Sequence, residues 1–211
     1  MDDTISYLPL FVFPVMKVQL DFDLEKLTEF SFEMWNKNKE GVQKTNIGGW
    51  QSDFIDEQKH EEFIKLQKKI NQYLQKYHLE IFKGMKFNGN VIQNLNSMWV
   101  NINEKHHHNE WHIHPLSTLS GVYYIKHDGS IKNGNITFKH PTGFYMNFSH
   151  WPKEFVEKTN EITSEQVPIT PKSNMLLIFP SWLEHKVEQN LKDDTRISLS
   201  FNASPILEKK S

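Results

Sequence analysis

The sequence predicts a mainly β protein with N-terminal helices (α+β), whose strands form a sandwich or a jelly-roll barrel. Two stretches before residue 86 carry apolar residues at helical spacing. About eight short strand-like segments, separated by turn-rich pieces, follow them. No internal repeat or flexible linker divides the 211 residues. We therefore expect one domain over residues 1–211, with a strand and helices at 1–85 packed on a β core at 86–205.

The first expected elements are a strand and a capped helix. Residues 8–20 are rich in β-branched and aromatic side chains, which favours a strand. Asp23 is placed to cap a helix over residues 24–38, whose apolar face carries Leu24, Leu27, Phe30 and Met34. Residues 46–50, with the sequence Asn-Ile-Gly-Gly-Trp, indicate a turn or loop.

A second, longer helix is expected to begin at Asp56 and to end at about residue 77. Its apolar stripe consists of Phe63, Leu66, Ile70 and Leu74. Glu61 and Lys65 lie four residues apart, as in an ion pair on a solvated helix face. Because both helices are amphipathic, each needs an apolar surface on which to pack.

The β core begins where the hydrophobic period changes, near residue 86. The expected strands are 91–92, 97–102, 111–114, 121–125, 135–138, 174–180, 185–188 and 196–202. The segment 143–170 interrupts them as a long insertion with several aromatic residues. Loops of that length are often functional, so the insertion is a candidate lid over a binding site.

The last strand has two chemically different faces. Alternation places Ile197, Leu199 and Phe201 on one face, and Arg196, Ser198, Ser200 and Asn202 on the other. The polar face could lie in water at the surface of a sandwich. Alternatively, the apolar face packs on the N-terminal helices while the polar face lines a cavity. The two amphipathic helices favour this second interpretation.

Composition excludes several classes of protein and of site. A net charge of −2 and a pI near 6.6, without a basic stripe, do not favour nucleic-acid binding. The chain has no cysteine, so His, Asp or Glu must hold any metal. The longest apolar stretch, residues 8–16, is too short to span a membrane, and the polar first residues do not resemble a signal peptide. We expect a cytoplasmic protein; its oligomeric state is not predicted.

Three histidines are candidate metal ligands. His112 and His114 are two positions apart, so on a strand both side chains point the same way, and His185 would approach from another strand. Imidazole suits iron, zinc, copper or nickel, so the ligands alone do not select the metal. Alternatively, the two histidines of such a pair can be exposed side chains that bind no metal. The run 106–108, three further histidines, is expected to be a polar loop.

Arg196 is a candidate anion ligand, because its guanidinium presents a fixed fork of donors to a carboxylate. The turn 190–195 would join it to His185 in a hairpin, and Ser198 would add a hydroxyl on the same strand face. The alternative is an exposed ion pair between Arg196 and Asp193 or Asp194. A metal site beside an anion clamp fits an iron enzyme that uses 2-oxoglutarate.

Several motifs in order resemble the 2-oxoglutarate/Fe(II)-dependent oxygenase superfamily, and within it a bacterial and phage group. The resemblance is carried mainly by residues 97–202, and also by Leu10–Pro14 and Gly48–Ser52. The motifs of the core are His112–Pro115, Ser120–Tyr124, Phe179–His185 and Arg196–Asn202. This resemblance implies a double-stranded β-helix core, the jelly-roll fold that cupins also have.

The resemblance also implies roles for individual residues. His112 and His185 match the two histidine ligands of the iron, and Arg196, with Ser198, matches the residue that binds the far carboxylate of 2-oxoglutarate. Tyr124 matches a strand tyrosine that binds 2-oxoglutarate in related prolyl hydroxylases. Asn101, on a core strand, is expected to face the same cavity.

The chain departs from the superfamily at position 114, where an Asp or Glu is usual and His stands here. Either the centre has three histidine ligands, or a carboxylate comes from elsewhere, with Glu110 the nearest on the same strand face. We take His112, His114 and His185 as the expected ligand set.

The expected function is that of an Fe(II)- and 2-oxoglutarate-dependent dioxygenase. It would use O2 to hydroxylate an unknown organic or peptidyl substrate and release succinate and CO2. Two alternatives stay open at this point. One is a cupin-like dioxygenase with a three-histidine metal site and no 2-oxoglutarate, which His114 favours. The other is a catalytically silent jelly-roll protein that binds a ligand.

Overall fold

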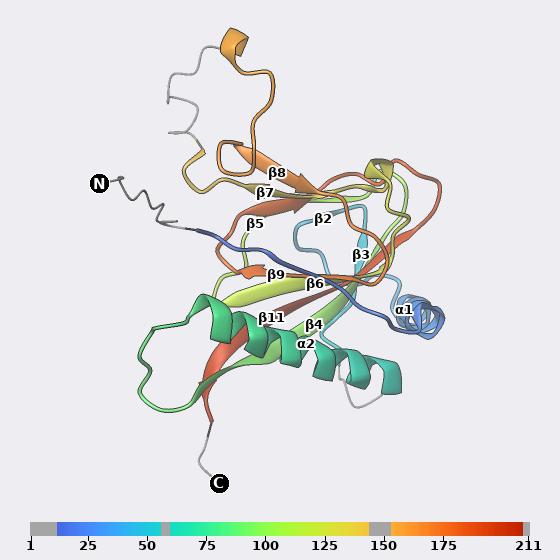
Figure 1. Cartoon of the computed structure of the whole chain (residues 1–211). Coiled ribbons are helices and arrows are strands. Elements are labelled where there is room, and N and C mark those ends of the chain that lie inside the picture. The colour runs from blue at the N-terminus through green and yellow to red at the C-terminus, as the bar shows by residue number, and fades with distance from the viewer. Residues whose placement is uncertain (1–11, 56–59, 144–152, 209–211) are drawn as a thin grey trace, which may run out of the picture.

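Two antiparallel sheets form two layers of the protein (Figure 1). The computed structural model describes residues 12–55, 60–143 and 153–208. The six-stranded sheet has the order β1 (Met16–Gln19), β9 (Met175–Pro180), β6 (Leu119–Lys126), β11 (Arg196–Leu207), β4 (Val91–Asn103) and β3 (Trp50–Gln51). The five-stranded sheet has the order β2 (Asn46–Ile47), β5 (His108–His112), β10 (His185–Val187), β7 (Ile136–Lys139) and β8 (Gln166–Ile169).

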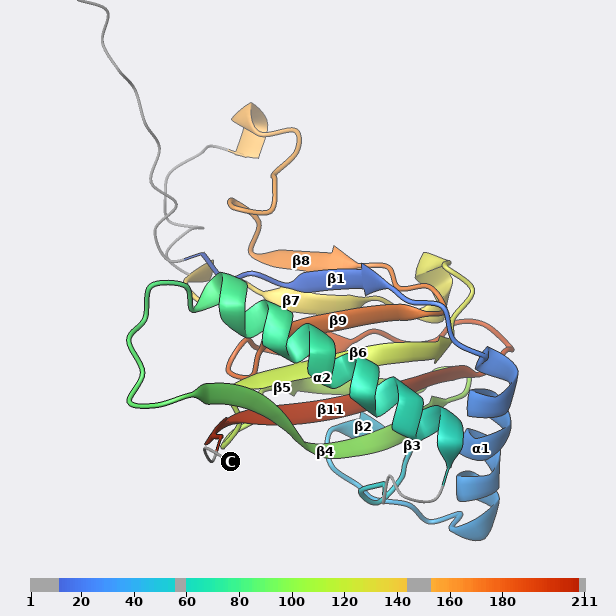
Figure 2. The ribbon, with the colours of Figure 1, turned by 60° about the horizontal axis from the view of Figure 1, so that its bottom comes forward.

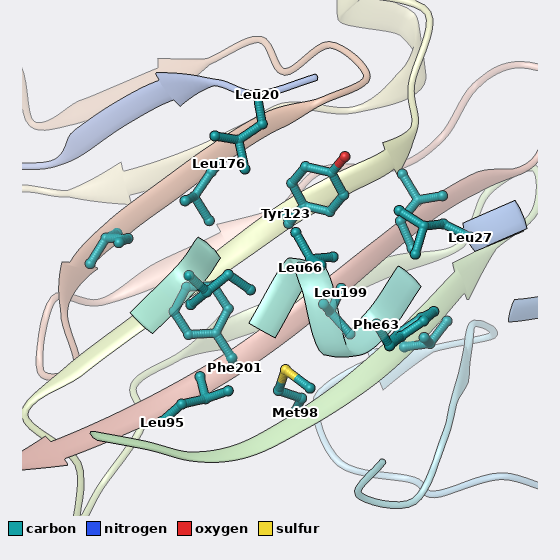
Figure 3. Close-up of a cluster of buried hydrophobic side chains, with 14 of the residues drawn as sticks. Leu20, Leu27, Phe63, Leu66, Leu95, Met98, Tyr123, Leu176, Leu199 and Phe201 are labelled. Carbon is teal, nitrogen blue, oxygen red and sulfur yellow. The ribbon is translucent and has the colours of Figure 1, made fainter. Parts of the chain in front are cut away.

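Both α-helices lie against the face of the six-stranded sheet that points away from the five-stranded one (Figures 1 and 2). They are α1 (Leu24–Lys37) and α2 (Glu61–Ile81); two short 3-10 helices, η2 (Ile131–Asn133) and η3 (Lys153–Phe155), lie in connections. The predicted stripe of α2 is fully buried on the sheet, and Figure 3 shows Phe63 and Leu66 among side chains from β4, β6 and β11.

The first helix begins as predicted. Asp23 is its N-cap, and its Oδ1 accepts hydrogen bonds from the backbone N–H groups of Glu25 and Lys26 at 3.2 and 3.4 Å. The second helix begins later than predicted, at Glu61, and continues to Ile81; Asp56 lies outside the described residues. Tyr77 faces the core, where its hydroxyl donates to the Pro14 carbonyl at 2.9 Å, and the next residue, His78, is also buried, so the helix still packs beyond its predicted end.

Some strand predictions were wrong in extent. Residues 46–50 hold two short strands rather than only a loop, joined at Gly48, whose φ of +75° suits glycine. The predicted strands 91–92 and 97–102 are one strand, because β11 pairs with β4 along its whole length. Residues 166–169 of the predicted insertion form an edge strand on β7; residues 144–152 of that insertion lie outside the described residues.

The predicted hairpin between His185 and Arg196 is also wrong. His185 lies on β10 of the five-stranded sheet, whereas Arg196 begins β11, which pairs with β4 and β6 in the other sheet. The turn 190–195 therefore crosses between the layers. Asn190 holds this crossing, because its side-chain amide donates to the carbonyls of Asn103 and Asp194. His185 and Arg196 thus belong to opposite walls of the same interior.

The two faces of β11 are arranged as the cavity interpretation predicted. Ile197, Leu199 and Phe201 are fully buried in the core that the helices cover. Ser198, Ser200 and Asn202 line a cavity on the other side of the sheet. The six-stranded sheet therefore separates the core that the helices cover from an interior between the sheets, which holds both the cavity and a second apolar cluster. Within the residues described, neither helix has the length and apolar character needed to cross a membrane.

Candidate active site

A cavity of about 340 Å³ lies between the two sheets. Three adjacent strands of the six-stranded sheet, β4, β11 and β6, contribute its polar wall. The register places Trp99, Ser200 and Val122 in one cross-strand row, and Asn101, Ser198 and Tyr124 in the next. The opposite wall includes His112 of β5 and His185 of β10. The cavity therefore brings the candidate histidines to face the polar side of β11.

The three predicted histidines come together at one end of this cavity. Each offers a ring nitrogen, and these three atoms all lie within 4.8 Å of one another. His112 and His185 are directly paired across β5 and β10, with ring centroids 4.3 Å apart. His114 lies two residues beyond the end of β5, so it does not share a strand with His112 as predicted. A backbone hydrogen bond to the Ser181 carbonyl, at 2.9 Å, fixes the chain at His114 instead.

Backbone carbonyls select the tautomer of two of these rings. His112 Nδ1 lies 2.7 Å from the Glu110 carbonyl oxygen, and His185 Nδ1 lies 2.8 Å from that of Leu183. Because a carbonyl only accepts, Nδ1 carries the proton in both rings. Nε2 then holds a lone pair, which is the arrangement of a metal-binding histidine with a carbonyl behind it.

The environment keeps the three imidazoles neutral. Burial lowers the pKa of His112, His114 and His185, and the neighbouring His112 lowers the other two further. The pKa of His114 falls to about 4. Metal ligands must be deprotonated, so this cluster is ready to bind a cation at neutral pH.

Glu110 does not join the cluster. Its side chain is mostly exposed, and its Oε1 lies 3.1 Å from His108 Nε2. Among the described residues, the group near His112 that can hold a metal consists of the three histidines alone. In the run 106–108, His106 and His107 lie in the predicted loop, where the His107 ring accepts a hydrogen bond from the Glu104 backbone N–H, but His108 begins β5 and pairs with Ile47.

Arg196 is buried with one nitrogen left without a partner. Its Nη1 donates to the carbonyls of Asn133 and Glu188, at 2.6 and 3.0 Å, whereas Nη2 has no hydrogen bond. The alternative ion pair does not form, because Asp193 pairs with Lys105 and Asp194 with Lys126. Burial lowers the pKa of Arg196 to about 10, so it remains a cation at neutral pH.

The other predicted cofactor-binding residues lie beside Arg196. Ser198 is two positions along β11, with Tyr124 opposite it on β6 and Asn101 opposite it on β4. The Tyr124 hydroxyl is buried without a hydrogen bond; burial raises its pKa, which the charge of Arg196 partly offsets. Asn101 Nδ2 donates to Ser200 Oγ at 3.0 Å. Two unpaired donors, Arg196 Nη2 and the Tyr124 hydroxyl, thus belong to residues whose charges interact. Tyr124 lines the cavity, whereas Arg196 is fully buried and is not among the lining residues.

Sequence reasoning missed residues that complete this arrangement. The carbonyls that hold Arg196 belong to Asn133 and Glu188, and backbone acceptors leave no side-chain signal in a sequence. Asn202 was predicted only as part of the polar face of β11; it lines the cavity, and its Oδ1 accepts a hydrogen bond from the Ser120 hydroxyl at 2.8 Å. Gln51 enters the cavity from β3, a strand too short to be recognised from its sequence.

Comparison with known proteins identifies a family and solved structures that this chain resembles. Residues 97–202 match the family described as "Putative 2OG-Fe(II) oxygenase", in which 2OG stands for 2-oxoglutarate. This match begins within β4, ends within β11 and includes every predicted site residue. No curated protein matches the chain at a significant level.

Solved structures share the fold. A prolyl-4-hydroxylase from Pseudomonas putida has a TM-score of 0.59 at 12% identity, covering 90% of this chain and 92% of its own. A Trichoplax adhaerens prolyl hydroxylase, solved with a hypoxia inducible factor peptide, has 0.59 at 15%, covering 91% and 83%. The non-heme alpha ketoglutarate dependent epimerase SnoN, from nogalamycin biosynthesis, has 0.59 at 13%, covering 90% and 76%. These likenesses confirm the predicted jelly-roll fold.

Proposed function

The chain belongs to the 2OG-Fe(II) oxygenase family and is an enzyme that uses Fe(II) and 2-oxoglutarate; from this premise we propose which residues bind each of them. His112, His114 and His185 hold the iron. Arg196, with Ser198 and Tyr124, binds the far carboxylate of 2-oxoglutarate, and Asn101 forms the cavity wall beside them. Of the three alternatives that the sequence left open, family membership selects the 2-oxoglutarate-dependent oxygenase.

The observation that carries this proposal is the unpaired end of a buried cation. A buried guanidinium that has only carbonyl partners keeps an uncompensated charge, which costs several kcal/mol unless an anion pairs with it. Nη2 of Arg196 and the hydroxyl of Tyr124 are both buried donors without acceptors. Native proteins rarely leave such groups unsatisfied. A carboxylate accepts from both at once, which is the property required of a 2-oxoglutarate site.

The three-histidine cluster fits iron by its donor chemistry. Imidazole is a ligand of Fe(II), and three protein ligands on one side leave positions open for 2-oxoglutarate and O2. The rings are held neutral by burial and are oriented by hydrogen bonds. Fe(II) and 2-oxoglutarate together supply the O2 chemistry, in which 2-oxoglutarate is decarboxylated to succinate and CO2 while the substrate is oxidised.

The residues of this chain supply position and exclusion of water. Arg196 Nη2 and the Ser198 hydroxyl would hold one end of 2-oxoglutarate, and the three histidines would hold the iron that its 2-oxo-acid end binds. Val122, Ile136 and Phe179 line the cavity with apolar side chains that limit the space for water.

Hydroxylation of an organic or peptidyl substrate is the proposed reaction. Two of the similar structures are prolyl hydroxylases, which supports hydroxylation, but the epimerase shows that the same fold serves other outcomes. The cavity near the histidines also contains Trp99, Asn109 and Gln51, which suit a neutral polar group of the substrate. Its lining, among the described residues, contains no Asp or Glu.

We also propose that the strand, the two helices and the β core form one catalytic domain. The stripe of α2 is buried on the six-stranded sheet, and the stripe of α1 packs against the same core with Leu27 buried and the rest partly buried. The other face of this sheet lines the cavity. Apart from this sheet, the helices would expose their apolar faces to water. The cytoplasmic location and the lack of nucleic-acid binding stay predictions from the sequence.

Arg196→Ala tests the anion site. Calorimetric titration of the protein with 2-oxoglutarate, anaerobically and in the presence of Fe(II), should show at least about a tenfold loss of affinity, since charged hydrogen bonds contribute about 1.5–3 kcal/mol each. Fe(II) affinity measured without 2-oxoglutarate should change little. Unchanged affinity for 2-oxoglutarate would remove Arg196 from the site.

A further inference from the structure

Two buried side-chain amides line the cavity without a hydrogen-bond partner. Gln51 and Asn103 are only 9% and 2% exposed. Their backbone carbonyls accept hydrogen bonds from Val42 N–H and from the Asn190 amide, at 2.8 and 3.1 Å. Their side-chain amides, by contrast, have no partner within the part of the chain that the structure describes. Buried polar groups are rarely left in this state, so the two amides indicate a binding site for a polar ligand.

The pairing of β3 with β4 brings these two amides together on the cavity face. Gln51 is directly opposite Asn101, and Asn103 is two positions farther along β4. Residues related diagonally in this way are within reach of each other's long side chains. A Cβ on residue 49 would lie 2.5 Å from the Asn103 Nδ2 atom, so Gly49 leaves the space that this amide occupies.

The pair of amides is separate from the proposed 2-oxoglutarate site. In one row across the sheet, Gln51 on β3 is three strands away from Tyr124 on β6. This places their backbones about 14 Å apart. The Asn103 amide nitrogen lies on the β3 side of β4, whereas Arg196 belongs to β11 on the other side of β4. The anion site therefore leaves both amides free for another ligand.

We propose that Gln51 and Asn103 form a recognition subsite that binds an amide group of the substrate. This inference rests on the proposed function, because it names a chemical group of the substrate of that same cavity. The proposed iron and 2-oxoglutarate residues all lie within the family match, residues 97–202. Gln51 lies before that match, as do the lining residues Thr45 and Phe54. A wall outside the matched core suits a role in substrate recognition rather than in the shared chemistry.

The hydrogen-bonding capacity of two carboxamides selects an amide as the ligand. Each carboxamide has an acceptor oxygen and an NH2 donor. A carboxylate would leave both oxygens unpaired, and an ammonium group would leave both nitrogens unpaired. An amide has a donor and an acceptor side by side, so it can form two parallel bonds, as Asn and Gln do with adenine. A nucleobase shares this property, but the net charge of −2 does not favour a phosphate backbone.

Side-chain ¹H–¹⁵N NMR of the full, metal-free chain measures the binding directly, because each NH2 group gives its own pair of signals. Acetamide is the probe for a side-chain carboxamide, and N-methylacetamide is the probe for a peptide bond. We expect saturable shifts of the Gln51 and Asn103 signals with a Kd of about 1–100 mM, as for other very small ligands. The probe that binds more tightly identifies the source of the amide.

Three variants test the assignment to these residues. Gln51→Leu, followed through the Asn103 signals, should bind the better probe at least about tenfold more weakly, and so should Asn103→Leu, followed through the Gln51 signals. Gln166→Leu is the matched control, since Gln166 is an exposed residue on β8, an edge strand of the other sheet. It should leave the affinity unchanged. Wild-type affinity in both Leu variants of the subsite would overturn the inference.

Other ligands give the remaining outcomes that would overturn it. Methyl acetate has no N–H donor, and acetate would instead pair with Lys44, which is exposed in the cavity lining. Equal or tighter binding of either ligand would contradict an amide subsite, as would tighter binding of 1-methylcytosine or no shift with either amide.

A final titration separates this inference from the proposed function. Saturating 2-oxoglutarate with Zn(II) should leave the amide affinity unchanged. Competition between 2-oxoglutarate and the amide would place Gln51 and Asn103 in the 2-oxoglutarate site, which would overturn the inference and leave the proposed function intact. A wild-type protein that binds the amide but neither Fe(II) nor 2-oxoglutarate would contradict the proposed function and retain the amide site.

Discussion

At the scale of single residues, the position of the Arg196 guanidinium depends on a glycine, Gly134. Gly134 lies against the guanidinium with a φ of +88°, and a Cβ there would overlap Arg196 Nη1 and the Glu188 carbonyl oxygen. These are the two atoms of one of the hydrogen bonds that hold the buried cation. The conformation and the close contact both require glycine.

Gly134→Ala should therefore weaken 2-oxoglutarate binding as well as stability. Gly129 is a matched control, because its φ is +79° but a Cβ there would meet only Lys172 Cβ, at 3.8 Å. Each alanine should cost about 1–2 kcal/mol of unfolding free energy because of the positive φ, and Gly134→Ala should cost more because its Cβ also overlaps Arg196 and Glu188. Only Gly134→Ala should lower 2-oxoglutarate affinity in a calorimetric titration. Equal 2-oxoglutarate affinities for the two variants would show that the contact with Gly134 is not needed to hold Arg196 in a binding position.

The buried histidines predict how stability depends on pH. In the unfolded chain they titrate near 6.5, whereas in the folded, metal-free protein the pKa of His114 is about 4 and those of His112 and His185 are also lowered. Between these values the unfolded state binds more protons. Stability is therefore present above about pH 6.5 and is lost as the pH falls towards about 4.

Urea unfolding of the metal-free protein at several pH values measures this loss. The His114→Gln variant should show a shallower decline than the wild type over the same window, since one of the groups that gain a proton on unfolding is absent. Identical pH profiles would mean that His114 titrates in the folded protein much as it does in the unfolded chain.

At the scale of elements, hydrophobic periodicity predicted the features that are set by residues close together in the sequence, such as helix faces and caps. The α2 stripe and the Asp23 cap follow from spacing within one helix, and both are present. The alternation of β11 likewise separated its core face from its cavity face. Partners distant in sequence were not predictable: the turn 190–195 looked like a hairpin, but it changes sheets because β11 pairs with β4 and β6.

The α2 stripe gives a prediction for helix packing. Leu66 is fully buried on the six-stranded sheet, whereas Leu79 on the same helix is 72% exposed. Leu66→Ala should lower the unfolding free energy by about 2–5 kcal/mol, and Leu79→Ala should change it by no more than about 0.5 kcal/mol. Chemical denaturation followed by both far-UV and tryptophan signals measures this. Two separate transitions would contradict the proposal that helices and sheets form one domain.

At the scale of the whole molecule, one sheet connects stability and function. Its outer face supports the helices (Figure 2). Its inner face carries the side-chain rows that face the cavity. The sequence motifs indicated candidate residues that the structure places around this cavity, among them the three histidines and Tyr124, because His and Tyr have distinctive chemistry. They could not predict the carbonyls of Asn133 and Glu188 that hold Arg196, or the hydrogen bond between Ser120 and Asn202, because those contacts exist only once separate strands have met.

The pairing of a three-histidine metal site with the Arg196 carboxylate site is tested most directly by one anaerobic titration. Protein freed of zinc and nickel is titrated with Fe(II) and 2-oxoglutarate, and the visible absorption is recorded. We expect a weak absorption band that requires both components and that is lost in Arg196→Ala at the same 2-oxoglutarate concentration. Binding of Fe(II) without that band at saturating 2-oxoglutarate would contradict the proposed site.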